Sequence, residues 1–267
     1  VDFRVSDYAN SDPAFPATYV GATGDDNYIK GYLALTNPDS VTPAFSYLGD
    51  TVTIQWAKKG MGTTATMIID YSASGSFAGG QGAYMGNINS AYAVGNAATG
   101  TFTYVTGWAP PYASTDFISE NYTIRLRPNA SPVPPVGTEI APTISFKVRP
   151  KFTSWVSPTP GLVWYCGDGP RNIQWTSKSA LKASTGLKPT VSVKYNVNNS
   201  LFGLVTPTST GISNEDGLNT FSWPQANIPT DLKDARIKIQ VSFDDYPDDV
   251  LIASQNIAIY PKITISA

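Results

Sequence analysis

The chain has 267 residues, a formal net charge of −2 and 14% charged residues, against about 25% in an average soluble domain. It contains no histidine and a single cysteine, so Ser-His-Asp catalysis, histidine-ligated or thiolate zinc sites and an internal disulfide are excluded. Because it has no basic run and no apolar stretch of roughly 20 residues, we expect neither nucleic acid as a partner nor membrane insertion by this segment.

The composition favours an all-β protein. The chain has 22 glycines and 21 prolines, which favour turns, and 15 tyrosines and 6 tryptophans, which favour strands. Glutamate, a strong helix former, occurs only at Glu120, Glu139 and Glu215. At roughly 100–200 residues per domain, the length favours two domains.

The first 30 residues form a segment of their own. Residues 1–5 have strand character and resemble residues 144–148, and the rest of the segment is rich in Asp, Pro, Tyr, Ala and Gly. We interpret residues 1–30 as a strand from a preceding module followed by an irregular insert. At the other end, residues 262–266 resemble residues 151–155. These two likenesses predict a longer parent array.

The remaining sequence is a tandem repeat. The sequence Tyr-Leu-Gly-Asp at residues 47–50 recurs as Tyr-Cys-Gly-Asp at residues 165–168, an offset of 165 − 47 = 118. Six collinear blocks of this kind indicate a duplication. The five further block pairs are residues 54–56 with 173–175, 65–72 with 189–196, 100–103 with 219–222, 122–127 with 236–241, and 144–151 with 257–262.

The repeated blocks alternate apolar and polar residues, as half-buried strands do. In the last of the long blocks, Ile237, Ile239 and Val241 are expected to face the core. About seven short strands in roughly 115–120 residues are typical of an antiparallel sandwich. We therefore predict an all-β chain of two tandem immunoglobulin-like antiparallel β-sandwich domains, residues 31–149 and 150–267. Almost no linker separates them, which favours a semi-rigid rod.

The densest group of charges is the sequence Asp-Asp-Tyr-Pro-Asp-Asp at residues 244–249. Four carboxylates so close together repel one another unless a cation or solvent compensates, and calcium takes six to eight oxygen ligands in such loops. The first copy has no carboxylate at the matching residues 128–132. Two interpretations stay open: a solvated turn, or a calcium site formed by Asp244, Asp245, Asp248 and Asp249. Asp25 and Asp26 form a smaller candidate.

The tryptophans fall into two groups. Trp56 and Trp175 lie mid-strand in both copies, so we expect them in the cores. The others lie near strand ends or loops, where exposed rings could stack on sugars and buried rings would seal the junction between modules. This second group comprises Trp108, Trp155, Trp164 and Trp223.

Two asparagines are candidate glycosylation acceptors. Asn121-Tyr122-Thr123 and Asn198-Asn199-Ser200 fit the acceptor pattern Asn-x-Ser/Thr. A third triplet, beginning at Asn129, is followed by Pro132, which disfavours it. We predict acceptors at Asn121 and Asn198.

The residues that could carry catalysis have structural interpretations. Glu120 and Glu215 have no counterpart in the other copy and are interpreted as solvated loop residues. The glycine-rich residues 79–82 precede no helix and indicate a flexible turn. Cys166 stands where the first copy has Leu48, so we expect a buried structural thiol. We therefore expect that the protein is not an enzyme.

The motifs Pro158-x-x-Gly161, Trp164-x-x-Gly167, Ile173-x-Trp175 and Val191-Ser192-Val193-x-Tyr195 resemble an immunoglobulin/fibronectin-III-like module of bacterial cell-wall and surface proteins. Ser/Thr-rich wall-anchored proteins and S-layer proteins contain such modules. The first copy lacks the first tryptophan and has Phe45 nearby.

The resemblance implies an extracellular structural role, as a lattice, fibre, stalk or adhesin component. We expect self-assembly with other copies or adjacent modules, with calcium as the one cofactor considered. The alternative is an adhesin or carbohydrate-binding module whose partners are surface glycans.

Overall fold

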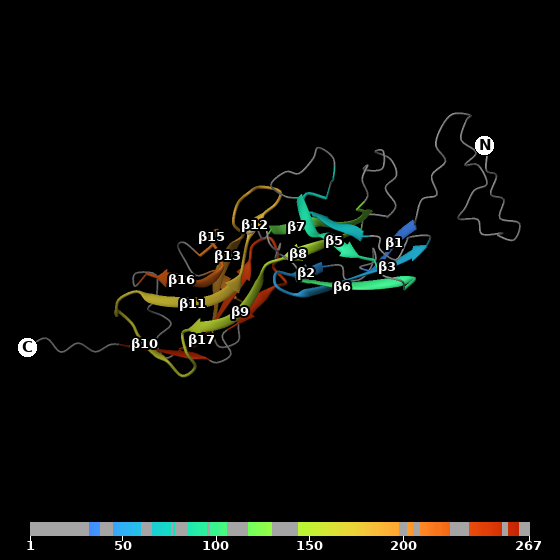
Figure 1. Ribbon diagram of the computed structural model, residues 1–267. Coiled ribbons are helices and arrows are strands. Elements are labelled where there is room, and N and C mark those ends of the chain that lie inside the picture. Colours follow the sequence, from blue (N-terminus) through green and yellow to red (C-terminus); the bar gives the residue numbers. More distant parts are fainter. Residues whose placement is uncertain are drawn as a thin grey trace, which may run out of the picture.

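The structure is a computed structural model in which every regular element of the described residues is a β-strand (Figure 1). The segment predicted over residues 1–30, which contains Asp25 and Asp26, lies outside the described residues, and so do Trp108 and Asn198. The described residues are 32–37, 45–59, 66–75, 77, 85–94, 97–105, 117–129, 144–197, 202–204, 209–224, 235–252 and 256–261.

The first half of the chain forms a sandwich of two sheets. Its strands are β1 (Tyr32–Asn37), β2 (Phe45–Tyr47), β3 (Thr51–Lys59), β4 (Thr66–Ser72), β5 (Met85–Ala93), β6 (Thr99–Val105), β7 (Phe117–Pro128) and β8 (Ile144–Arg149). One sheet has the order β1-β3-β6 and the other the order β2-β8-β7-β4-β5. All neighbours are antiparallel except β2, which runs parallel to β8. We call this sandwich module one.

The second half repeats this architecture as module two. Its strands are β9 (Lys151–Ser157), β10 (Val163–Tyr165), β11 (Arg171–Lys178), β12 (Leu181–Lys182), β13 (Thr190–Val197), β14 (Gly203–Leu204), β15 (Ile212–Ser213), β16 (Gly217–Trp223), β17 (Ala235–Phe243), β18 (Val250–Ile252) and β19 (Ile257–Tyr260). The sheets have the orders β16-β11-β9 and β10-β19-β17-β13-β14. Again the short strand β10 runs parallel to the last strand, β19.

The strand order identifies the fold class. In each module the first strand is divided between the two sheets, and its second half runs parallel to the last strand. Two packed antiparallel sheets with this connectivity form an immunoglobulin-like sandwich. The prediction of two tandem immunoglobulin-like β-sandwiches is therefore confirmed, whereas the boundaries 31–149 and 150–267 stay predictions.

One detail of the sequence match is wrong by one residue. Pairing residues 122–127 with 236–241 placed Leu126 beside Gln240. In the structure Leu126 lies opposite Ile69, while Val193, the counterpart of Ile69, lies opposite Val241. A shift of one residue turns every side chain of a strand to the other face, so Leu126 corresponds to the buried Val241.

The two mid-strand tryptophans lie in the cores, as predicted, but are packed differently. Trp56 is 1% exposed and lies opposite Gly100, where an added Cβ would stand 2.3 Å from the indole ring. Trp175 is fully buried opposite Asn219, and its Nε1 donates a 2.9 Å hydrogen bond to Asn214. Module one thus makes room for its indole with a glycine, while module two satisfies its indole N–H with a buried amide.

This difference predicts that Gly100→Ala destabilises module one. A Cβ so close to a buried ring must displace Trp56 or the β6 backbone, and overpacking of this kind costs about 1–3 kcal/mol. Urea denaturation followed by tryptophan fluorescence measures the loss. Gly169→Ala is the control, because no atom lies within 4 Å of the added Cβ. Equal effects of the two substitutions would contradict the packing argument.

Candidate functional site

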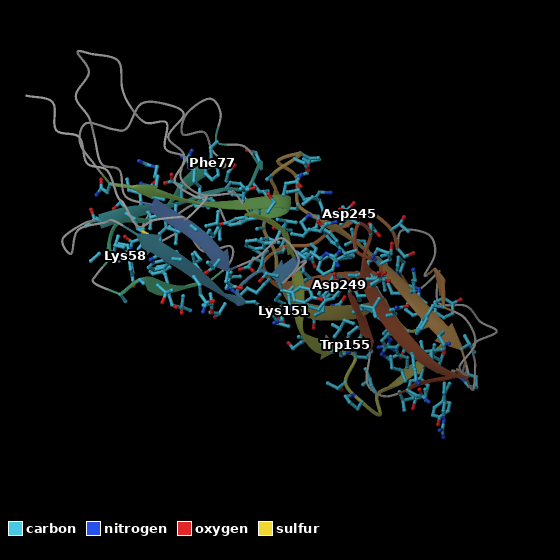
Figure 2. The ribbon with its side chains drawn as sticks, turned by 90° about the vertical axis from the view of Figure 1, so that its right-hand side faces the viewer. Lys58, Phe77, Lys151, Trp155, Asp245 and Asp249 are labelled. Atoms are coloured by element: carbon cyan, nitrogen blue, oxygen red, sulfur yellow. The ribbon has the colours of Figure 1, made fainter. Side chains whose placement is uncertain are left out.

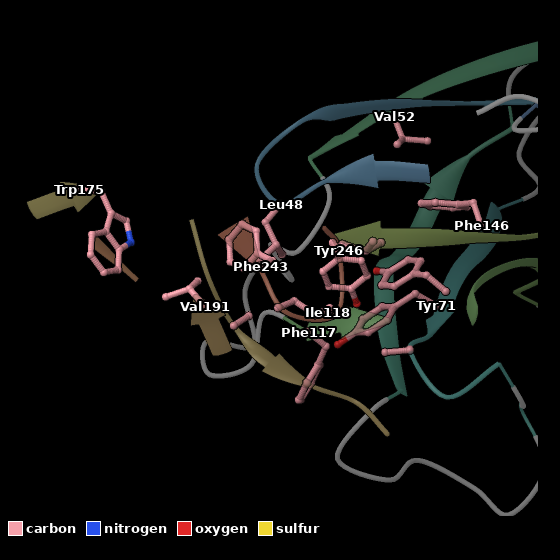
Figure 3. Close-up of a cluster of buried hydrophobic side chains, with 14 of the residues drawn as sticks. Leu48, Val52, Tyr71, Phe117, Ile118, Phe146, Trp175, Val191, Phe243 and Tyr246 are labelled. Carbon is pink, nitrogen blue, oxygen red and sulfur yellow. The ribbon is translucent and has the colours of Figure 1, made fainter. Parts of the chain in front are cut away.

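The two modules meet end to end at a buried apolar junction (Figure 1). Figure 3 shows Leu48 of module one beside Phe243 of module two, with Ile118 and Tyr246 close by. The exposed fractions are 4% for Leu48, 1% for Ile118, 0% for Phe243 and 7% for Tyr246. These side chains belong to one hydrophobic cluster that includes the cores of both modules. Full burial of a phenylalanine contributes about 1.5–3 kcal/mol, so the junction contributes substantially to stability.

The backbone also crosses the junction. Strand β12 lies in the loop between β11 and β13 of module two, yet it pairs in parallel with the start of β7 in module one. Ala183, directly after β12, donates its N–H to the carbonyl oxygen of Ile118 at 2.8 Å. Module two therefore extends a sheet of module one, which covers part of an otherwise open strand edge.

A partly buried hydrogen bond joins the end of β2 to the loop after β17. The hydroxyl of Tyr47 donates to Oδ1 of Asp249 at 2.5 Å, and Arg149 Nη1 lies 3.7 Å from Oδ2 of the same carboxylate. The hydrogen bond to Asp249, together with burial, raises the pKa of Tyr47 to about 12. The phenol is therefore a stable donor at neutral pH. Figure 2 shows Asp249 and Lys151 at mid-length of the molecule, where the modules meet.

A second polar group surrounds Glu120. Lys147 Nζ lies 2.8 Å from its carboxylate, and Tyr246 of module two donates a hydrogen bond to it. Burial and this hydrogen bond raise the pKa of Tyr246, whose ring lies 5.2 Å from the Arg149 guanidinium. Burial alone would raise the pKa of Glu120, but the bonds from Lys147 and Tyr246 and the nearby cations outweigh it, so that the pKa is lowered.

Two lysines add ion pairs at the rim. Lys151, the first residue of β9, lies 2.9 Å from Asp50 and 5.7 Å from the ring centre of Tyr47. Lys182 of β12 lies 2.8 Å from Asp245. Since exposed pairs of this kind contribute at most about 1 kcal/mol, they orient the contact more than they stabilise it.

The four aspartates proposed for calcium are not gathered around one point. Asp245 and Asp249 take part in the junction, Asp244 turns back into module two to accept a 2.5 Å hydrogen bond from Ser192, and Asp248 is exposed. Among the described residues, no three carboxylate, cysteine or histidine side chains are placed to hold a metal ion. Calcium binding stays a prediction, and the loop has a second use as a docking element.

The proposed glycosylation acceptors also stay predictions. Asn121 is exposed on β7 and lies close to Gly75, so that a Cβ added at Gly75 would stand 2.9 Å from the Asn121 Cβ.

Two of the four tryptophans considered for sugar binding are buried. Trp164 and Trp223 are 2% and 0% exposed and pack edge to face inside module two, with ring centres 5.9 Å apart. They neither face solvent nor seal the junction, because both are core residues of the sandwich. Trp155 is partly buried, and its Nε1 donates to the Pro158 carbonyl oxygen at 2.8 Å.

Two further expectations need correction. Glu120 was interpreted as a solvated loop residue; it is exposed, but it lies within β7 and at the junction, whereas Glu215 is exposed beside Lys188, as expected. Cys166 was expected to be buried like Leu48, but it is only partly buried, and among the described residues no second module covers it as module two covers Leu48.

Sequence reasoning missed most of the junction residues. The available signal was the repeated Tyr-x-Gly-Asp turn, followed in module one by the short Arg-Pro-Lys connection at residues 149–151. The residues that converge on the turn come from three separate parts of the chain. They are Glu120, Arg149, Tyr246 and Asp249.

The comparisons with known proteins leave the family open. No protein-family model and no curated protein matches the sequence. A marsupial T cell receptor is 10% identical with a TM-score of 0.27, covering 90% of this chain and 75% of its own. The Pseudomonas fluorescens alkylpurine DNA glycosylase AlkC, bound to DNA containing an abasic site analog, is 15% identical with a TM-score of 0.26, covering 45% of this chain and 30% of its own. TM-scores below 0.5 carry no argument about function.

Within the described part of the chain, no helix has the length and apolar character needed to span a membrane.

The Tyr47–Asp249 bond predicts measurable coupling between the modules. Tyr47→Phe and Asp249→Asn should each weaken docking by about 1.5–3 kcal/mol, the usual contribution of a hydrogen bond to a charged group. The double variant should be less than additive by about 0.5–3 kcal/mol. Exchange of the Ala183 amide hydrogen reports docking, since that amide is bonded across the junction. Asp248→Asn, in the same loop but exposed, is the control, and a fully additive cycle would contradict the prediction.

The lowered pKa of Glu120 predicts that acid weakens the junction. A carboxylate with a depressed folded-state pKa stabilises the docked state above its unfolded value, about 4.3, and this contribution is lost as the pH falls through the folded-state pKa. Protection of the Ala183 amide, corrected for intrinsic exchange, should decline over this range. The change should be modest because the Glu120 side chain is 49% exposed.

The matched pair of variants for this pH experiment is Glu120→Gln and Glu215→Gln. Glu215 also has a lowered pKa, mainly through its hydrogen bond from Lys188, but its ion pair with Lys188 and its hydrogen bond from Ser213 both lie within module two. Only Glu120→Gln should flatten the pH dependence at Ala183. An unchanged curve in that variant would assign the acid effect to another group.

Proposed function

We propose that this chain is a structural segment of an extracellular surface protein, in which immunoglobulin-like modules stacked end to end act as a stiff spacer. The observation that carries the proposal is the junction, where the apolar cluster is continuous from one module into the other. Interfaces between domains of one chain normally permit relative motion unless they are sizeable and apolar. A buried apolar junction with a shared sheet resists bending.

The sequence supports the same role. The copies share their core positions and turn glycines but few of their charged residues, so the duplication multiplies a scaffold and not a chemical site. The resemblance to modules of bacterial surface proteins, including S-layer, fibre and stalk proteins, agrees with this role. Location outside the cell, self-assembly, calcium binding and glycosylation at Asn121 and Asn198 belong to the proposal as further expectations.

The alternative function is an adhesin or carbohydrate-binding module that is not an enzyme. One observation favours it: Tyr165 and Tyr260 are 45% and 43% exposed, with ring centres 6.4 Å apart. Exposed aromatic rings can contact the apolar faces of sugars, and the matching positions of module one carry no such exposed pair, since Tyr47 is partly buried and Arg149 takes the place of the second ring.

The spacer proposal predicts a rigid solution shape. Small-angle X-ray scattering of the whole chain should fit a single arrangement of the two modules. Ile118→Asp should broaden the distribution of inter-module angles, because it places a charge at a position that is 1% exposed. Leu218→Asp is the control, since Leu218 is 58% exposed. Circular dichroism verifies that both variants keep their sheets. A native chain whose scattering requires many inter-module angles would contradict the spacer role.

A further inference from the structure

The far end of module two repeats the turn with which module one holds its neighbour. Residues 47–50 follow β2, and residues 165–168 follow β10. Gly49 and Gly167 both have positive φ, 83° and 81°. The backbone N–H of Asp50 donates to the carbonyl oxygen three residues before it, at 3.0 Å, and that of Asp168 does the same at 3.3 Å. The backbone of the docking turn is therefore present twice.

The strands beside the two turns also correspond. Tyr47 lies opposite Arg149 in the β2–β8 pair, and Tyr165 lies opposite Tyr260 in the β10–β19 pair. Leu48 donates its N–H to the Arg149 carbonyl oxygen at 2.9 Å, and Cys166 donates its N–H to the Tyr260 carbonyl oxygen at the same distance. The sequence continues as Pro-Lys after both strands, at residues 150–151 and 261–262.

The two turns differ in whether their side chains are covered by another module. Leu48 is 4% exposed beneath module two, whereas Cys166, at the same position of the repeat, is only partly buried. Tyr165 and Tyr260 are among the exposed large apolar side chains of the described residues. Within the described part of the chain, the end of module two therefore presents the backbone of a docking surface whose tyrosines are not covered by another module. We call Tyr165, Cys166 and Tyr260 the terminal patch.

We propose that the terminal patch binds a third immunoglobulin-like module through an acidic, aromatic loop of the kind formed by residues 244–249. The junction between modules one and two provides the template. By that template, the Tyr165 hydroxyl donates to a carboxylate of the incoming loop as Tyr47 does to Asp249. An apolar side chain of the incoming module covers Cys166 as Phe243 covers Leu48 (Figure 3).

One difference between the first junction and the terminal patch indicates which type of residue the partner needs. Module one has the cation Arg149 beside its docking tyrosine, and module two has Tyr260 there. At the first junction Arg149 forms an ion pair with Asp249, whereas at the terminal patch Tyr260 offers an aromatic ring in its place. Binding at the terminal patch should therefore depend less on salt than docking at the first junction. Asp168 is paired with Arg171 at 2.7 Å instead of with a lysine of the next strand. The partner therefore needs an aromatic or apolar residue opposite Tyr260.

This inference rests on the proposed spacer function and extends it to a defined surface. It is tested with a three-module chain, in which Lys262 of the full chain is followed by a second copy of residues 152–267. The native Pro-Lys sequence at residues 261–262 reproduces the existing connection at residues 150–151. The added copy carries Cys166→Leu, the residue of module one, so that the original Cys166 is the sole thiol.

Alkylation of that thiol by iodoacetamide reports whether the terminal patch is covered. In the three-module chain the rate should fall at least about tenfold relative to the native chain, the factor that corresponds to one tenth of the molecules being open. Tyr165→Ala in the three-module chain should restore much of the reactivity. Leu218→Ala is the control, because Leu218 is exposed and lies near the other end of β16 from Trp223. Trp223 pairs with Arg171, which follows the turn of the terminal patch.

Exchange at the Ala183 amide in the same molecule separates the two proposals. If Ala183 stays protected while Cys166 reacts as fast as in the native chain, the terminal patch does not bind a module and this inference is overturned, although the spacer function stands. If Ala183 itself exchanges freely, the spacer function fails. Binding of an oligosaccharide to the native chain that is lost in Tyr165→Ala, with no protection of Cys166 in the three-module chain, would assign the patch to sugar and also overturn the inference.

Discussion

Phe243, the last residue of β17, and Tyr246, in the loop that follows, are buried where module two meets module one. Phe243 is 0% exposed and stacks on Phe152, with ring centres 4.2 Å apart. Removing module one would expose these rings to water, and such exposure opposes any separation of the modules. The proposed stiffness of the pair, the contact of Asp249 with module one and the pKa shifts at the junction all depend on this burial.

Burial also explains why the junction has so many polar contacts. A carboxylate removed from water needs donors or a cation, or it takes up a proton. Asp249, whose side chain is 12% exposed, has the Tyr47 hydroxyl and the Arg149 guanidinium. Glu120 is half exposed and has both Lys147 and Tyr246 as partners. The charges thus define the relative orientation of the modules, while the apolar contacts supply most of the stability. In the loop that resembles a cation site in sequence, Asp245 is paired with Lys182, and Asp249 lies 3.7 Å from Arg149.

The duplication has preserved geometry more closely than chemistry. Both copies keep the divided first strand and the turn with a glycine of positive φ, because these determine which sheet each half-strand joins. The copies differ where a core or a surface has more than one solution. Gly100 and Asn219 stand opposite equivalent tryptophans, and Arg149 and Tyr260 stand beside equivalent tyrosines.

The sequence alone determined the fold class, the duplication and the central core positions. Alternation of side chains along strands and the spacing of turns are local signals, so Trp56, Trp175 and the alternating residues of β17 could be assigned to the core directly. The same periodicity repeats every two residues and carries no mark of where to start. For this reason the match of β7 with β17 was displaced by one residue.

Only the tertiary structure decided the junction. Its residues are far apart in the sequence: Tyr47 and Asp249, which share a hydrogen bond, are separated by 202 residues. The local sequence around each of them does not indicate that they share a partner. Asp244 and Asp249 look alike in sequence, yet one turns inward to Ser192 and the other reaches Tyr47 of module one. Which carboxylate is neutralised, and by what, depends on the packing of two sandwiches against each other, a long-range property that periodicity and composition do not encode.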